Sequence, residues 1–111
     1  MAYVPDRGDV VKLDFDPQSG HEQAGRRPAL VLSPASYNGK VGLAIVLPIT
    51  GQAKGYPYEV KIPRGNKVTG VVLSDQVKSV DWRTRKAALF DRLPESLVAE
   101  AVENSRRSED K

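Results

Sequence analysis

Two adjacent arginines, Arg26 and Arg27, stand where a polar loop leads into an apolar run. The loop ends in Glu22-Gln23-Ala24-Gly25-Arg26-Arg27-Pro28, and the apolar residues Ala29 to Leu32 follow directly. A guanidinium binds phosphate oxygens through a planar fork of donors and stays charged at every working pH. A flexible glycine before the pair and a buried strand after it would hold this fork against a rigid support. The pattern indicates a phosphate-binding site, although two solvated loop charges would have the same sequence.

Several further motifs follow this stretch or precede it in a fixed order. They are Tyr3-Val4-Pro5-Asp6-Arg7-Gly8-Asp9, Leu32-Ser33-Pro34, Leu47-Pro48-Ile49-Thr50, Lys54-Gly55-Tyr56-Pro57-Tyr58-Glu59-Val60 and Asp75-Gln76-Val77-Lys78-Ser79. Together with the arginine pair they resemble the MazF/PemK family of toxin endoribonucleases from bacterial toxin–antitoxin modules. The resemblance covers most of the chain and weakens in the last helix. It implies a sequence-specific endoribonuclease that cuts single-stranded mRNA by 2′-OH attack, leaving 2′,3′-cyclic phosphate and 5′-OH ends.

Cleavage of RNA without a metal ion requires three kinds of help. A base must take the 2′-OH proton, a cation must stabilise the phosphorane, and an acid must protonate the leaving 5′ oxygen. Arg27 is the expected phosphorane stabiliser because its charge does not titrate. The resemblance also assigns proton transfer to this arginine, which conflicts with a guanidinium that stays protonated over the whole working range. Glu22 is the easier base, and the choice between Glu22 and Arg27 stays open.

Thr50 is the third expected catalytic residue. It ends an apolar run just after Pro48, so its hydroxyl would emerge at the rim of the sheet and could donate to a phosphate oxygen. Spacing alone favours a threonine that merely ends a strand, whereas the resemblance implies that this threonine is catalytic. The family often has a second hydroxyl residue at the next position, where this chain has Gly51.

Other polar and aromatic residues are candidates for RNA contact. Single-stranded RNA is commonly bound by stacking bases on aromatic faces while basic groups follow the backbone. Trp82, in contrast, closes a strand-like run and is expected to be packed in the core. The expected RNA-binding residues are Arg26, Gln23, Lys54, Tyr56, Tyr58, Gln76 and Lys78.

The sequence favours neither a metal site nor a catalytic histidine. The single His21 lies in a polar loop, where a solvated role is the simpler one. Asp14 and Asp16 form a carboxylate pair of a kind seen around Mg²⁺, but a strand end followed by a proline turn explains them. No cysteine is present, which excludes disulfides and thiolate sites and fits a reducing cytoplasm. We therefore expect no metal and no cofactor.

The elements that must position these residues are short strands punctuated by Gly and Pro. One predicted strand, Pro28–Leu32, is continuously apolar and is typical of a strand buried on both faces. A turn or helical turn ended by Gly39 is expected after it, and Asp75–Val80 is ambiguous between helix and strand. The other predicted strands cover 10–15, 41–49, 58–62, 68–73 and 86–90. A helix is expected to start at Leu93-Pro94-Glu95 and to fray beyond Ser105, leaving a polar tail at 105–111.

This pattern predicts one mainly β domain over residues 1–111, a small barrel with a C-terminal α-helix. The resemblance implies an SH3-like barrel of the PemK/CcdB type and a two-fold homodimer. Neither a membrane-spanning segment nor a leader is expected, so the predicted location is the cytoplasm. Apolar residues make up 40% of the 111 residues, as in an ordinary globular domain.

Charge favours an anionic partner. Residues 1–94 carry 14 Lys and Arg against 9 Asp and Glu, whereas residues 95–111 carry 3 against 5. A basic body suits nucleic acid, although a surplus that only aids solubility fits as well. The resemblance implies an antitoxin partner whose acidic, disordered segment occupies the RNA groove. Two alternatives stay open at this point: a non-catalytic toxin of the same fold that binds DNA gyrase, and a plain nucleic-acid-binding module.

Overall fold

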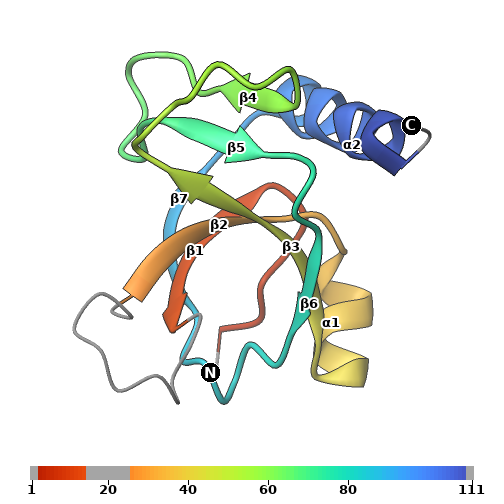
Figure 1. The fold of residues 1–111 in the computed structure, drawn as a ribbon. Coiled ribbons are helices and arrows are strands. Elements are labelled where there is room, and N and C mark those ends of the chain that lie inside the picture. The colour runs from red at the N-terminus through yellow and green to blue at the C-terminus, as the bar shows by residue number, and fades with distance from the viewer. Residues whose placement is uncertain (1–2, 15–25, 110–111) are drawn as a thin grey trace.

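A strongly curved antiparallel sheet forms the body of the protein (Figure 1). The computed structural model describes residues 3–14 and 26–109. Within them the strands are β1 (Asp9–Asp14), β2 (Arg26–Val31), β3 (Ala44–Thr50), β4 (Glu59–Lys61), β5 (Val71–Leu73), β6 (Lys78–Val80) and β7 (Ala88–Arg92). The helices are α1 (Ala35–Val41) and α2 (Glu95–Glu109). The predicted architecture, a mainly β domain with a C-terminal helix, is confirmed.

Strand β3 is the centre of the topology. It pairs with β2 along one edge, through Ala29 with Pro48 and Val31 with Val46. Its other edge pairs with β6 at the Ala44 end and with β5 at the Thr50 end. The remaining strands extend this arrangement in the order β4-β5-β3-β2-β1-β7. Along this edge the end of β3 at Thr50 lies beside β5, and the segment that joins β5 to β6 follows towards Ala44.

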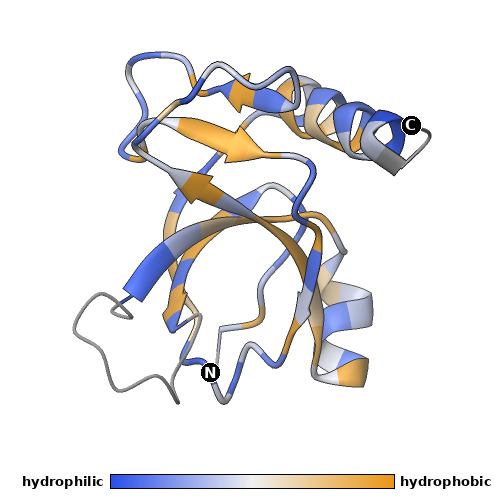
Figure 2. Cartoon of the chain, in the orientation of Figure 1, coloured by the Kyte–Doolittle hydropathy of each residue, from blue (hydrophilic) through white to orange (hydrophobic). Residues whose placement is uncertain are grey.

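The central strands are buried on both faces, as the continuous apolar run predicted. Val10, Leu30 and Leu47 face one hydrophobic cluster, which α2 covers with Leu97, Val98 and Ala101. Their chain neighbours face the second cluster, because successive strand residues point to opposite sides. That cluster comprises Val11, Leu13, Ala29, Val31, Ala44, Val46, Val80 and Trp82. The hydropathy colouring in Figure 2 shows the apolar residues along these strands and polar residues in the connecting loops.

Trp82 is packed in the core, as predicted. It is 4% exposed, and its indole Nε1 donates a hydrogen bond of 3.0 Å to the carbonyl oxygen of Asn38. The buried Asn38 side chain in turn donates to the carbonyl oxygens of Pro5 and Ser33 and accepts from the Ser33 hydroxyl. Helix α1 is thereby fixed to the N-terminal segment and to the strand-like run before Trp82.

Most element boundaries differ from the prediction by a few residues, and those of α1, β3 and α2 have clear physical reasons. Helix α1 runs through Gly39 to Val41, because Gly42, with φ 84°, provides the left-handed C-cap that ends it. The predicted strand 41–49 consequently begins only at Ala44. Helix α2 does not fray at Ser105 but continues to Glu109, since Ser105 is buried and Glu103 forms ion pairs with Arg106 and Arg107. Of the expected polar tail, only residues 110–111 lie outside the described part.

Candidate active site

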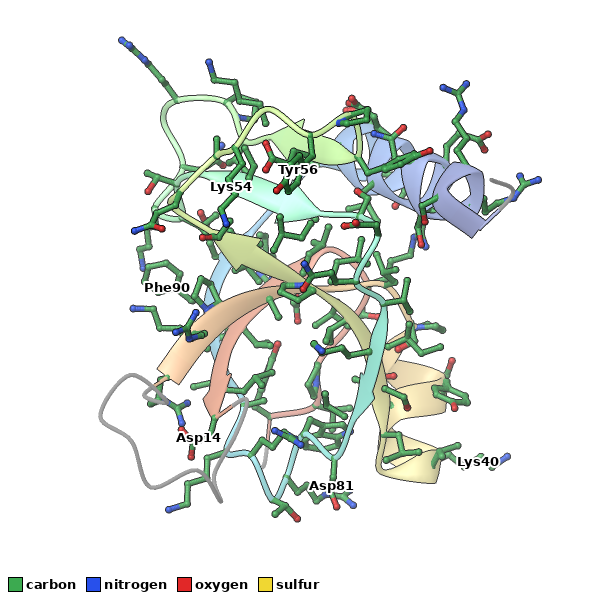
Figure 3. The ribbon with its side chains drawn as sticks, in the orientation of Figure 1. Asp14, Lys40, Lys54, Tyr56, Asp81 and Phe90 are labelled. Atoms are coloured by element: carbon green, nitrogen blue, oxygen red, sulfur yellow. The ribbon has the colours of Figure 1, made fainter. Side chains whose placement is uncertain are left out.

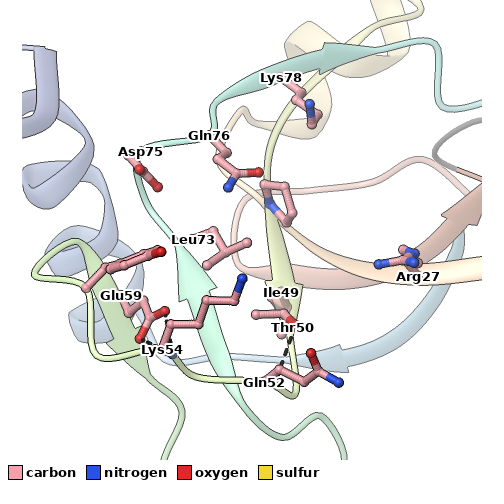
Figure 4. A pocket seen from close by; sticks show the side chains of 12 residues that line it. Arg27, Ile49, Thr50, Gln52, Lys54, Glu59, Leu73, Asp75, Gln76 and Lys78 are labelled. Atoms are coloured by element: carbon pink, nitrogen blue, oxygen red, sulfur yellow. Dashed lines mark hydrogen bonds between the residues drawn. The ribbon is translucent and has the colours of Figure 1, made fainter.

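A cavity of about 310 Å³ opens where β3 ends. Its walls come from β2, the end of β3, the loop between β3 and β4, and the segment from β5 to β6 (Figure 4). Six of the residues predicted to act on RNA lie in these walls, although they come from separate parts of the chain. The lining residues are Arg27, Pro48, Ile49, Thr50, Gln52, Lys54, Tyr56, Glu59, Leu73, Asp75, Gln76 and Lys78.

The strand register explains why Arg27 and Thr50 face the same cavity. Ala29 is paired with Pro48 in this antiparallel pair. Arg27 lies two residues before Ala29 and Thr50 two residues after Pro48, so both side chains project from the same face of the sheet. Lys78 pairs with Val46 and joins this face from β6. The buried part of the face is the second hydrophobic cluster, and its open end carries the polar residues. Backbone pairing alone thus brings a guanidinium, a hydroxyl and an ammonium group to one hollow.

Arg26, which the sequence predicted as an RNA contact, does not line this cavity. It is the neighbour of Arg27 on β2 and therefore points to the opposite face. Its guanidinium donates to the carbonyl oxygens of Lys12, at 2.8 Å, and of Lys86, and it lies 3.5 Å from the Asp14 carboxylate. Arg26 consequently fastens β2 to β1 and to the turn before β7.

The Thr50 hydroxyl is held in a defined orientation. Its Oγ1 accepts a hydrogen bond of 3.2 Å from the backbone N–H of Gln52. A hydroxyl that accepts in this way still has its own proton to donate. The backbone of Thr50 is also held by its pairing with Val71 of β5, and Gly70 packs so closely against it that a Cβ at Gly70 would lie only 2.0 Å from the Thr50 carbonyl oxygen. The structure therefore presents Thr50 as a hydrogen-bond donor at a rigid position.

The loop between β3 and β4 forms the second wall. Lys54 extends from this loop across the cavity in Figure 4, and Tyr56 is 58% exposed beside it. Glu59, at the start of β4, lines the same wall and was missed by the sequence prediction. Tyr58 is half-buried and lies outside the lining, so the structure does not bring it to the cavity with Tyr56.

The third wall is the segment from β5 to β6, with Leu73, Asp75 and Gln76 before Lys78. A hydrogen bond of 3.2 Å from the Gln76 N–H to the Leu73 carbonyl oxygen closes a turn here. The turn exposes the Gln76 side chain, whose amide can both donate to and accept from a base edge. The lining as a whole carries three cationic side chains, Arg27, Lys54 and Lys78, against the carboxylates of Asp75 and Glu59.

The remaining predicted residues lie elsewhere. Glu22, Gln23 and His21 are outside the described residues, in the connection that leads into Arg26. Asp14, one half of the carboxylate pair considered for Mg²⁺, lies away from Lys54 and Tyr56 and is paired with Arg26 (Figure 3). Within residues 3–14 and 26–109, no group of three or more His, Asp or Glu side chains could hold a metal ion.

Neither helix of the described part is long and apolar enough to cross a bilayer.

Comparison with known proteins identifies the family of this chain. Residues 6–106 match the family described as "PemK-like, MazF-like toxin of type II toxin-antitoxin system". The chain is 56% identical to the endoribonuclease toxin MazF of Escherichia coli strain K12 over 85 residues, which cover 77% of this chain and 76% of that protein. It is 40% identical to the endoribonuclease toxin ChpB of the same strain over 103 residues, covering 87% of each.

Solved structures agree with the sequence comparison. The crystal structure of MazF from Deinococcus radiodurans superposes with a TM-score of 0.89 at 50% identity and covers 99% of this chain and all of that chain. A MazE–MazF crystal structure from the same organism gives a TM-score of 0.85 at 46% identity, covering 96% and 95% of the two chains. The family indicated by the sequence motifs is therefore confirmed: this chain belongs to the PemK-like, MazF-like toxins of type II toxin–antitoxin systems.

Proposed function

We propose that this protein is an endoribonuclease toxin that cleaves single-stranded RNA in the cavity at the end of β3, without a metal ion. The observation that carries the proposal is the convergence of Arg27 and Thr50 on one cavity whose other walls hold Lys54 and Lys78. A scissile phosphodiester has two non-bridging oxygens. The Arg27 guanidinium and the Thr50 hydroxyl, which project from one face, can each donate a hydrogen bond to one of them. The family membership and the named endoribonuclease relatives support the same activity.

The proposed reaction is an internal transesterification. The 2′ oxygen of the RNA attacks the neighbouring phosphorus, the bond to the 5′ oxygen breaks, and a 2′,3′-cyclic phosphate and a 5′-OH form. The 2′-OH proton goes to a base, for which Glu22 and Arg27 are the candidates, and the 5′ oxygen takes up a proton from the protonated base or from water as it leaves. Arg27 stabilises the added negative charge of the phosphorane. Thr50 donates its hydroxyl proton to a non-bridging oxygen while the Gln52 N–H holds its orientation.

The other walls bind the strand on either side of the cleaved bond. Tyr56 presents an exposed ring on which a base can stack, and Lys54 and Lys78 neutralise phosphates. Gln76 offers an amide to a base edge. Gln23 and Tyr58 are proposed as further RNA contacts. The β3–β4 loop and the β5–β6 segment therefore bind the RNA strand, and the residues at the ends of β2 and β3 carry out the chemistry.

The proposal includes a homodimer, a cognate antitoxin and action in the bacterial cytoplasm, where mRNA is found. The MazE–MazF crystal structure of D. radiodurans is a toxin–antitoxin complex with a similar chain. An acidic antitoxin segment would compete with RNA for the cationic lining, because both carry regularly spaced negative charge.

Paired substitutions test the assignment of Arg27 and Thr50. Arg27→Ala removes a charged donor to the phosphorane, so we expect the single-turnover cleavage rate to fall by about 10²- to 10³-fold. Thr50→Ala removes a neutral donor to the same developing charge, and the expected loss is about 10²-fold. Arg64→Ala and Thr69→Ala make the same changes at exposed positions outside the cavity and should cleave at the wild-type rate.

The result that contradicts the assignment is full cleavage by the folded Arg27→Ala variant. Intact RNA with the wild-type protein would remove the nuclease itself. Salt-sensitive RNA binding without cleavage would then favour a nucleic-acid-binding module, and gyrase binding a toxin of the alternative kind.

A further inference from the structure

The β3–β4 loop has little packing to hold it in place. Residues 51–57 are all exposed, and neither Gly51 nor Gly55 has an atom within 4 Å of where a Cβ would stand. Gly55 also adopts a left-handed backbone with φ +80°. Without apolar contacts, the shape of such a loop depends on its hydrogen bonds. These bonds therefore decide where Lys54 and Tyr56 stand.

The Glu59 carboxylate supplies three of these hydrogen bonds. It accepts from the Lys54 N–H at 3.0 and 3.2 Å, one bond to each oxygen, and from the Gly55 N–H at 3.0 Å. Glu59 itself stands on a rigid element, because its strand β4 pairs with β5 and contributes Val60 to the hydrophobic cluster under α2. Hydrogen bonds to an ionised acceptor are about twice as strong as neutral ones. Glu59 thus ties the tip of the loop to the body of the protein.

We infer that Glu59 is a positioning residue for RNA binding, which deepens the proposed function and rests on it. Its carboxylate holds the loop in the conformation in which Lys54 extends across the cavity (Figure 4) and Tyr56 lines it. The location of Glu59 is otherwise unfavourable, because an uncompensated carboxylate in the wall of an anion-binding cavity repels phosphate. The two backbone N–H groups compensate that charge and give the carboxylate a structural purpose.

The sign of one substitution separates the two effects of this carboxylate. Glu59→Gln keeps the size of the side chain and removes one negative charge. It loses the bond that Lys54 makes to one oxygen, and it replaces the ionised acceptor for the Lys54 and Gly55 N–H groups by a neutral amide oxygen, which makes weaker hydrogen bonds. If Glu59 acted only through its charge, the variant would bind RNA more tightly. If it positions the loop, the variant binds RNA less tightly despite the more favourable charge.

The experiment measures amide exchange and RNA binding on the same variants. In Glu59→Gln we expect the Lys54 and Gly55 amides to exchange about tenfold faster, and the KM for RNA to rise about tenfold with kcat nearly unchanged. Glu59→Asp, which retains the ionised acceptor on a shorter side chain, should recover part of the KM. The control Glu100→Gln removes the same charge from an exposed site on α2 and should leave both readings unchanged.

Tighter RNA binding by Glu59→Gln, or unchanged exchange of the two amides, would overturn the inference. Faster exchange with an unchanged KM would overturn it too, because the loop would then move without affecting RNA. A wild-type protein that fails to cleave RNA would refute the proposed function instead. In that case the amide exchange rates of Lys54 and Gly55, together with the Kd for an RNA carrying 2′-deoxy sugars, still test the role of Glu59.

Discussion

Gly70→Ala should lower the cleavage rate by displacing the Thr50 backbone, although it replaces no side chain that lines the cavity. An alanine Cβ at this position would lie 2.0 Å from the Thr50 carbonyl oxygen, 2.8 Å from the Thr50 carbonyl carbon and 2.9 Å from the Gly51 Cα. Because protein Cβ atoms do not approach other atoms closer than 3.0 Å, the end of β3 and the backbone at residue 70 must separate by about 1 Å. A displacement of this size at a reacting group costs about 10²-fold in rate.

The substitution also carries a cost in stability, which a second glycine isolates. Gly70 has φ +110°, so an alanine there is strained in addition to its clash, and we expect a total loss of about 2–4 kcal/mol in the free energy of unfolding. Gly65 has φ +100° and no atom within 4 Å of the place that an alanine Cβ would occupy, so Gly65→Ala introduces the strain alone. Strain of this kind costs roughly 1–3 kcal/mol.

Urea unfolding and single-turnover cleavage at saturating RNA should be measured for both variants, at a temperature where both are folded. The expected result is that Gly65→Ala loses stability but cleaves normally, while Gly70→Ala loses both stability and about two orders of magnitude in rate. Equal cleavage rates for the two folded variants would show that the position of Thr50 is unimportant, and the reasoning about this residue would be refuted.

Two further predictions concern the scaffold. Asn38→Ala should lower the free energy of unfolding in urea by about 2–4 kcal/mol, because it removes the acceptor of the Ser33 hydroxyl proton and the side-chain donor to the Pro5 and Ser33 carbonyl oxygens; a loss below about 1 kcal/mol would contradict this. For Asp91, burial opposes ionisation, but N–H bonds from Val68, Arg92 and Lys67 outweigh it and hold the pKa below its usual value. This stabilisation is present above the unfolded pKa of about 4 and is lost as the pH falls through the folded pKa. Asp91→Asn should therefore show a weaker loss of stability under acid than the wild type in urea titrations below about pH 5, and an identical acid profile would refute the assignment.

The sequence motifs predicted the members of the site better than their geometry. Six of the cavity-lining residues were predicted as RNA-binding or catalytic, because their types suit RNA and their motifs match a family. They are Arg27, Thr50, Lys54, Tyr56, Gln76 and Lys78. The separation of Arg26 from Arg27 was missed because the strand was expected to begin at Pro28. It begins at Arg26, and the alternation of a strand then sends the two side chains to opposite faces.

The roles of Glu59 and Gly70 depend on contacts that no local pattern contains. The alternation of apolar and polar residues in Tyr58–Ile62 is typical of a half-buried strand, but it does not show that the preceding loop turns back over the Glu59 carboxylate. Gly70 was part of a predicted strand, and only the pairing of β3 with β5 reveals how closely its backbone approaches Thr50. Likewise, the end of α1 was placed at Gly39, because either of two nearby glycines could supply a helix cap. Such features follow from tertiary pairing, to which single-sequence periodicity is blind.

The chemistry of the RNA ends tests the central claim most directly. Purified protein should be incubated in EDTA with an RNA that contains its cleavage sites, alongside the same RNA with 2′-deoxy sugars at those sites. The account predicts cleavage of the first RNA alone, with 2′,3′-cyclic phosphate and 5′-OH ends. Cleavage that EDTA abolishes, 5′-phosphate ends, or cleavage of the 2′-deoxy substrate would contradict a metal-independent attack by the 2′-OH in the cavity of Arg27 and Thr50.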